Sequence, residues 1–310
     1  MSSEQEKLLR AMAESQQSVA MLLKNQARTH RWRFFFFALL CVPGIALYCM
    51  ILWSIADDKL ISDTKYVGLV DASGVVGQHI QSDRVISGLK KAFSDKKVET
   101  VLLRLNSPGG SPVEGKLIHD AMLRLRSEHP DKKMLVLGTE SLASAAYLIA
   151  VGADEILVQP ATIAGSIGVI MSGYDLSELA ARVGIKRRIL TAGQNKAGLD
   201  PLMPAEPDDI EKMQSVLDKI HLQFIADVKK GRGDRLPADA QLFDGNYWTG
   251  EEAVELGLVD GIGSVDSLMA GRFYNHELRY FTQEMSIMDK FNSKMDTLKE
   301  WVFPASIWSL

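Results

Sequence analysis

A single hydroxyl opens a short apolar helix near the middle of the chain. The stretch "SLASAAYLIA" follows a predicted strand, and Ser144 stands at the start of this helix among the alanines at 143, 145 and 146. The first N–H groups of a helix have no acceptor within the helix, so they can stabilise an anion there. Ser144 is therefore a candidate nucleophile, and the alternative is an ordinary serine N-cap.

A lysine in a weakly charged loop is the candidate base for that serine. Lys196 lies in "TAGQNKAGLDPLMP", where Asp200 is the only other charged residue. A lysine withdrawn from water loses its proton more readily and can then accept the proton of a serine hydroxyl. The alternative is a solvated loop lysine. No histidine lies near Ser144 or Lys196 in the sequence, so a Ser-His-Asp triad has little support.

Two adjacent glycines mark a junction between a predicted strand and a predicted helix. They are Gly109 and Gly110 in "NSPGGSP". Glycines leave backbone N–H groups accessible, as a turn that stabilises an oxyanion requires. An ordinary tight turn is the alternative for this motif.

Composition excludes several other kinds of site. The net charge of −4 gives no reason to expect a nucleic-acid partner. The two cysteines, Cys41 and Cys49, lie within one apolar run, and the six histidines are scattered without the spacing of a zinc site. We expect no metal and no cofactor.

An apolar run near the N-terminus predicts a membrane anchor. Residues 34–56 carry no charge, and as a helix they would extend about 35 Å, enough to cross a bilayer. A cleaved signal peptide is disfavoured because 33 residues precede the run, and a soluble core helix is seldom apolar on every face. Basic residues precede the run and acidic ones follow it, so the N-terminus should be cytoplasmic and the larger part extracytoplasmic.

Short apolar runs alternate with helical patterns from residue 66 onward. Strands are predicted in 66–74, 99–110, 132–141, 154–160 and 165–173. Continuous apolar strands of this kind favour a mostly parallel sheet covered on both faces. A helix is expected after the glycine turn, with Val113, Leu117, Ala121 and Leu125 on one face.

Two further amphipathic patterns follow in the C-terminal third of the chain. Residues 203–230 predict a long helix with a stripe from Ile210 to Val228, and residues 281–310 predict a weaker amphipathic tail. The order of elements predicts an α/β fold in one anchored domain.

The order of the motifs resembles one enzyme family. "LRLNSPGG", "SLASAAYLIAVGADEILVQPATIAGSIGVI", "AGQNKAGLDPL", "FIADVKKGRG" and "LFDGNYWTGEEAVELGLVDGIG" are together similar to the short form of the signal peptide peptidase A (protease IV) family. The resemblance extends from about Tyr66 to Leu268. It implies a fold like that of the Clp protease and crotonase families, a repeated ββα superhelix. The family consists of membrane-anchored Ser-Lys peptidases.

The resemblance also implies roles for individual residues. Ser144 corresponds to the nucleophile, Lys196 to the general base, Ser166 in "AGSIG" to the serine that orients the lysine, and Gly109 to the oxyanion turn that Gly110 continues. The family usually has two glycines after the nucleophile, where this chain has Ala145 and Ala146; alanine fits if those positions are helical.

These observations predict a serine endopeptidase of the bacterial inner membrane that cleaves apolar peptides such as remnant signal peptides. Its partners would be peptide substrates, the lipid bilayer and further copies in a ring. The expected division is a cytoplasmic segment 1–33, a transmembrane helix 34–56, a Ser-Lys peptidase domain 57–280 and the tail 281–310. The alternatives are a non-catalytic membrane scaffold and a crotonase-like acyl-thioester enzyme. The Arg-Gly-Asp tripeptide in "GRGDR", residues 231–235, is interpreted as chance.

Overall fold

The computed structural model describes residues 21, 35–37, 39, 41–53, 64–193, 195–237 and 241–282. It divides into two units, Met1–Asp63 and Thr64–Leu310. The predicted segment 1–33, apart from residue 21, and the tail from residue 283 lie outside the described residues. The first unit contains a helix over Phe35–Trp53, with a mean hydropathy of 2.4, that is long and apolar enough to cross a membrane.

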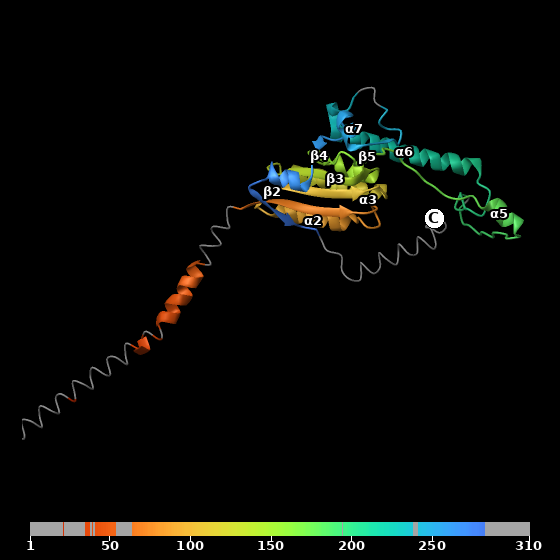
Figure 1. Cartoon of the computed structure of the whole chain (residues 1–310). Coiled ribbons are helices and arrows are strands. Elements are labelled where there is room, and N and C mark those ends of the chain that lie inside the picture. Colours follow the sequence, from red (N-terminus) through yellow and green to blue (C-terminus); the bar gives the residue numbers. More distant parts are fainter. Residues whose placement is uncertain are drawn as a thin grey trace, which may run out of the picture. The chain divides into compact units, whose positions relative to one another are not determined.

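An eight-stranded sheet forms the centre of the second unit (Figure 1). Its main path runs β6-β5-β3-β2-β1-β8, and β4 and β7 extend from β3. The strands are β1 (Lys65–Ser73), β2 (Val98–Ser107), β3 (Lys133–Ala143), β4 (Glu155–Val158), β5 (Ile163–Gly165), β6 (Tyr247–Trp248), β7 (Gly261–Ile262) and β8 (His276–Tyr280). Every pairing is parallel except β5 with β6.

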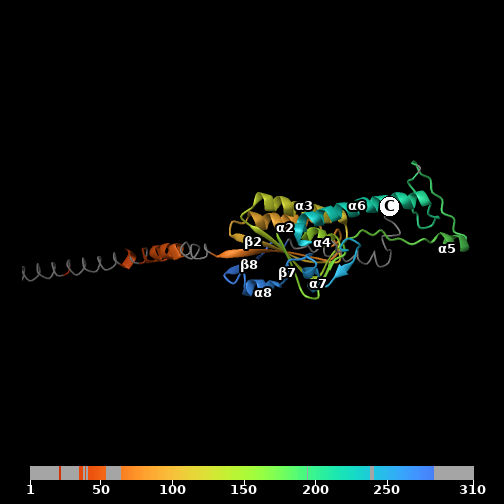
Figure 2. The same ribbon diagram turned by 90° about the horizontal axis from the view of Figure 1, so that it is seen from above.

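Helices cover both faces of this sheet (Figure 2). One side carries α2 (Ser82–Ser94), α3 (Pro112–Glu128), α4 (Ala145–Ala150) and α6 (Pro207–Arg232), and the other carries α8 (Val265–Ala270). The helix α7 (Gly250–Glu255) lies beside β5, β6 and β7, and its Ala253 belongs to the larger of the two core clusters. Successive residues of β3 alternate between the two cores: Val136 belongs to the larger cluster, while Leu135 and Leu137 pack with Leu268 in the smaller one. Because both faces are buried, the strands are apolar throughout, and the predicted parallel sheet is confirmed.

One sequence prediction about elements is wrong, and another is confirmed only in part. The run 165–173 is not a strand, since β5 ends at Gly165 and the chain then has no regular structure as far as Leu176. The helix after the glycine turn is present as α3, and Ala121 and Leu125 of its predicted face are buried, but Val113 is 66% exposed and Leu117 is also exposed. In both places the described part of the chain leaves some of the apolar pattern uncovered.

The helix α6 begins in the solvent and ends in the core. Its predicted stripe is buried only at Phe224 and Val228, and Ile210 near its start is 53% exposed. Residues 169–206, here called the arm, lead away from β5, include α5 (Ser177–Arg182) and return to the start of α6 (Figure 2). The arm has its own contacts, among them the Arg187–Asp200 ion pair at 3.3 Å.

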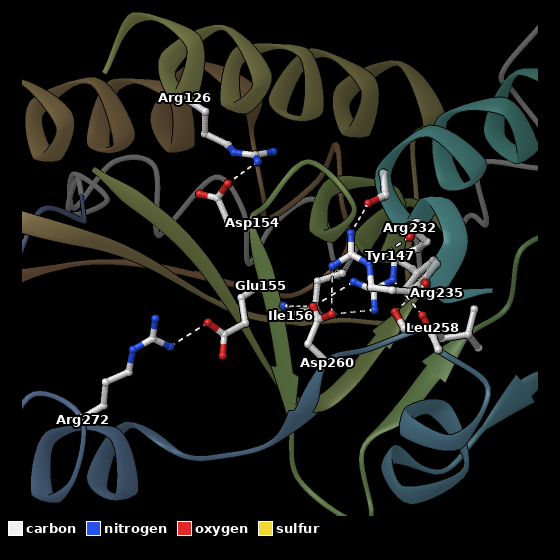
Figure 3. Close-up of polar contacts among 12 residues, drawn as sticks. Arg126, Tyr147, Asp154, Glu155, Ile156, Arg232, Arg235, Leu258, Asp260 and Arg272 are labelled. Atoms are coloured by element: carbon white, nitrogen blue, oxygen red, sulfur yellow. Dashed lines mark hydrogen bonds and ion pairs between the residues drawn. The ribbon is translucent and has the colours of Figure 1, made fainter. Parts of the chain in front are cut away.

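A buried ion pair fixes the C-terminal end of α6 (Figure 3). Arg232 is 2% exposed and donates through Nη1 and Nη2 to Asp260 at 2.8 and 2.9 Å. Asp260 also accepts the Ile156 N–H at 2.7 Å and a bond from Arg235 at 2.9 Å. Since Arg232 is enclosed, the Arg-Gly-Asp tripeptide cannot present its arginine to a partner.

The charge balance at Asp260 makes its ion pair with Arg232 sensitive to acid. Burial alone would raise the pKa of Asp260, but the hydrogen bonds from Arg232 and Ile156 and the charges of Arg232 and Arg235 hold it below the ordinary value. Because the pKa of Asp260 is lower in the folded chain than in the unfolded chain, its carboxylate contributes its full stabilisation above the unfolded pKa of about 4. This contribution is lost as the pH falls from there through the lower pKa of the folded state.

We predict that Asp260→Asn lowers the free energy of unfolding by about 3–5 kcal/mol, because it leaves the buried Arg232 charge unpaired. Urea unfolding at pH 7 measures the change, and the acid dependence described above should diminish in the variant. The matched control is Glu155→Gln, which breaks the more exposed pair with Arg272 drawn in Figure 3 and should cost less than about 1 kcal/mol. Equal losses in the two variants would contradict the prediction.

Candidate active site

Ser144 lies at a sharp turn between β3 and α4. Its backbone has φ 53° and ψ −123°, a sparsely populated conformation for a residue with a side chain. Its side chain makes no capping hydrogen bond, so the N-cap alternative is wrong. The Ser144 N–H donates to the Gly165 carbonyl at 2.8 Å, and the Ser144 carbonyl accepts the Leu148 N–H at 3.0 Å. A strained strand-turn-helix junction of this kind projects a serine hydroxyl from the fold.

The two alanines after Ser144 lie in the helix. Ala145 and Ala146 open α4, and both are buried. The positive φ falls on Ser144 itself and on neither alanine. The departure from the family pattern therefore introduces no backbone strain, and the N–H groups of this first turn have no intrahelical acceptors.

The glycine turn lies directly against Ser144. Gly109 has φ +114°, and a Cβ at this position would lie 2.7 Å from the Ser144 Cβ and 3.1 Å from its Oγ. The Gly109 N–H donates to the Ser107 hydroxyl at 3.1 Å, and the Gly109 carbonyl accepts the Val76 N–H at 2.8 Å. Among the described residues the Gly110 N–H has no acceptor, so this donor is free for a ligand.

Ser166 occupies a second strained turn beside the first. Gly165 pairs with Ala143 across β5 and β3, which places Ser166 next to the Ser144 turn. Ser166 has φ 50°, its N–H donates to the Asn246 carbonyl at 2.7 Å, and its carbonyl accepts the Gly168 N–H at 3.0 Å. The structure thus brings together three of the predicted elements: Ser144, the glycine turn and Ser166.

Lys196 is not brought to this site by its own chain. It lies in the arm with an exposed side chain, and within the described part of the chain no hydrogen bond or ion pair holds its amine. Its backbone N–H donates to the Gly193 carbonyl at 3.2 Å. The same loop contains Leu199 at φ 62° and approaches the start of α6, where the Asp209 carboxylate lies against Gly198.

Three residues at or near the predicted site residues have a strained backbone. Ser144, Ser166 and Leu199 are the non-glycine residues with positive φ in the part of the chain that the structure describes. Each such conformation costs about 1–3 kcal/mol and persists only where its surroundings enforce it. Two of the three are the serines that the family resemblance assigns to the site, and the third lies three residues after Lys196.

Sequence reasoning missed two histidines that support these turns. His119 is buried in α3 and donates from Nδ1 to the Leu148 carbonyl at 2.9 Å, while the Leu148 N–H in turn holds the Ser144 carbonyl. Burial lowers the pKa of His119, an effect that the Asp227 carboxylate partly opposes. His221 in α6 donates from Nε2 to the Ile167 carbonyl at 3.1 Å. Both histidines stand at helical spacing from buried residues, a signal that could have indicated them.

Among the described residues no group of three or more His, Cys, Asp or Glu side chains could hold a metal ion. What the described part of the site offers is a strained serine, a backbone N–H donor and a second serine. These groups suit attack of a hydroxyl on a carbonyl carbon once a base is supplied.

Comparison with known proteins shows which proteins the chain is similar to. Residues 126–272 match the family described as "Peptidase family S49". A "Putative signal peptide peptidase SppA" of Enterococcus faecium is 34% identical over 184 residues, which cover 59% of this chain and 53% of that protein. A Brucella melitensis protein described as "Na(+)/H(+) antiporter NhaA" is 42% identical over 181 residues, which cover 58% of this chain and 24% of that protein.

A solved structure described as a membrane-bound stomatin-specific protease in complex with a substrate peptide is 20% identical. It matches with a TM-score of 0.48, covering 76% of this chain and 99% of that one. The chain spans about a quarter to a half of the length of the two curated relatives above. The family match and the curated relatives support the resemblance of the ordered motifs to peptidase family S49, the signal peptide peptidase A family.

Proposed function

We propose that the protein is a membrane-anchored serine endopeptidase in which Ser144 is the nucleophile and Lys196 the general base. The observation that carries the proposal is the strained Ser144 turn, against which Gly109 packs so closely that no side chain would fit between them. A serine that merely caps a helix needs neither the strain nor the adjoining N–H donor.

The proposed reaction is acyl transfer to a serine. The uncharged Lys196 amine accepts the Ser144 Oγ proton while Oγ bonds to the peptide carbonyl carbon. The carbonyl oxygen becomes an anion that backbone N–H groups of the glycine turn, led by Gly110, stabilise. Collapse breaks the C–N bond, and the lysine returns its proton to the leaving amine. Water, deprotonated by the same amine, then hydrolyses the acyl-enzyme and restores Ser144.

We propose that Lys196 reaches Ser144 in a neighbouring copy of the chain. Its own chain leaves it exposed on the arm, and the arm also exposes large apolar side chains such as Ile170 at 86% and Leu190 at 93%. Apolar surface of this extent is typical of an interface between subunits. Closed rings bring such arms onto the next subunit, and packing there would withdraw the amine from water.

The proposed substrates are extended apolar peptides, with remnant signal peptides as the class that the relatives' names suggest. The helix Phe35–Trp53 supports an anchor, and the basic residues before it support a cytoplasmic N-terminus with the peptidase outside the bacterial inner membrane. The two alanines after Ser144 were the reason to consider a non-catalytic scaffold, and their unstrained helical conformation supports the catalytic proposal instead.

We predict that a serine-reactive fluorophosphonate labels the wild-type chain and that Ser144→Ala abolishes the labelling. Lys196→Ala should lower peptide turnover by about 10²–10⁴-fold, the usual contribution of a general base. Near-full activity in Lys196→Ala would show that the base is assigned wrongly.

Mixing two inactive variants tests whether the dyad forms between copies. Ser144→Ala chains supply Lys196 and Lys196→Ala chains supply Ser144, so rings assembled from an equal mixture should regain about a quarter of the sites. Each variant refolded alone serves as the control. If the wild type is active and the mixture recovers nothing, the pairing between chains is refuted.

We further predict that Gly109→Ala lowers the rate of Ser144 labelling by about 10²-fold, because the added Cβ displaces the nucleophile. Gly261→Ala is the matched control, since Gly261 lies outside the arm and the nearest atom to its added Cβ would be 3.5 Å away, an ordinary contact. Labelling rates at equal protein concentration measure both variants. Similar rates in Gly109→Ala and the wild type would refute the placement of the glycine turn.

A further inference from the structure

We propose that His221 is a positioning residue that holds the Ser166 turn in its strained conformation. This inference rests on the proposed function, in which Ser166 orients the Lys196 amine. His221 would touch neither substrate nor base, and would act on the reaction only through Ser166.

The contact joins α6 to the residue after Ser166. The Ile167 carbonyl accepts two hydrogen bonds, one from the Gly245 N–H at 3.1 Å and one from His221 Nε2 at 3.1 Å. A carbonyl oxygen has two lone pairs, so the two donors together satisfy it fully. Ile167 itself is fully buried, which means that water cannot readily replace a missing donor.

The turn needs such support because its backbone is strained. The peptide group before Ser166 is held by the Ser166 N–H, which donates to the Asn246 carbonyl, and by the Gly165 carbonyl, which accepts the Ser144 N–H. The peptide group after Ile167 is held by the bonds to the Ile167 carbonyl from Gly245, in the same loop as Asn246, and from His221 of α6. Without His221, the loop alone would hold this carbonyl against the positive φ of Ser166.

The position of His221 along α6 gives the contact a further consequence. Near its start the helix meets the Lys196 loop, where Asp209 lies against Gly198, and near its end Asp227 pairs with Lys116 of α3 at 3.0 Å. His221 lies between these two points. The same rigid helix therefore fixes the root of the arm and the turn that is to receive the lysine of another copy.

The chemistry of the contact suggests a conservative replacement. The bond requires a hydrogen on Nε2, which one neutral tautomer and the cation both carry. Glutamine presents an amide N–H at a similar reach, while leucine fills similar space without a donor.

The test is a double-mutant cycle on the full-length chain in detergent. Ser144 labelling rates, kcat and KM for an apolar peptide, and Tm are measured for His221→Leu, His221→Gln, Ser166→Ala and the double variant His221→Leu/Ser166→Ala.

We expect His221→Leu to lower the labelling rate and kcat about tenfold with little change in KM, and His221→Gln to recover most of the loss. In the Ser166→Ala background His221→Leu should have no further effect. Gln223→Leu, on an exposed position of the same helix, is the control.

The outcomes separate the inference from the proposed function. If the wild type is labelled at Ser144 and Ser166→Ala is impaired, but His221→Leu behaves as the wild type or multiplies the Ser166→Ala defect, the positioning role is refuted while the peptidase assignment stands. If Ser144→Ala keeps its labelling, the proposed function itself fails. If Ser166→Ala leaves the labelling rate and kcat unchanged, Ser166 does not orient the lysine, and the positioning role of His221 is refuted as well.

Discussion

The backbone of Ser144 has to stay in a conformation that a residue with a side chain normally avoids, and the neighbouring elements are arranged around that requirement. The cost of about 1–3 kcal/mol is offset by contacts on both sides of the residue. Its N–H is bonded to β5, and its carbonyl is bonded within α4. If either contact were lost, the serine could relax and its hydroxyl would leave the glycine turn.

The helix α4 can support this turn only because other helices hold it. It has six residues, too few to be stable by itself in water. From α3, His119 bonds to its Leu148 carbonyl, and Gly115 allows an approach so close that a Cβ there would lie 3.1 Å from the Ala145 carbonyl. Tyr147, fully buried, donates to the Leu258 carbonyl at 2.7 Å. Ser144 is therefore positioned by contacts from distant parts of the sequence.

Sequence patterns predicted those features whose causes are local. Apolar strands followed by helical periodicity indicated the parallel sheet, and the small residues around Ser144 and the adjacent glycines indicated the two turns. The patterns failed at 165–173, at Val113 and Leu117, and along the first half of α6. Hydrophobic periodicity reports that a face is to be covered, but it does not say by what. The histidines were missed because their value lies in one hydrogen bond each to a carbonyl far away in the sequence.

In the proposed assembly, the same exposed surface explains why the base is absent from the site of a single chain. An amine enclosed beside Ser144 during folding would have to be buried without a counter-charge, which destabilises a domain. On an exposed arm, Lys196 stays solvated until a neighbouring copy covers it, and the apolar contacts of the arm then supply the free energy that its desolvation requires. On this proposal Ser144 is placed by folding and Lys196 is added by assembly, so a lone chain would remain inactive toward the peptides around it.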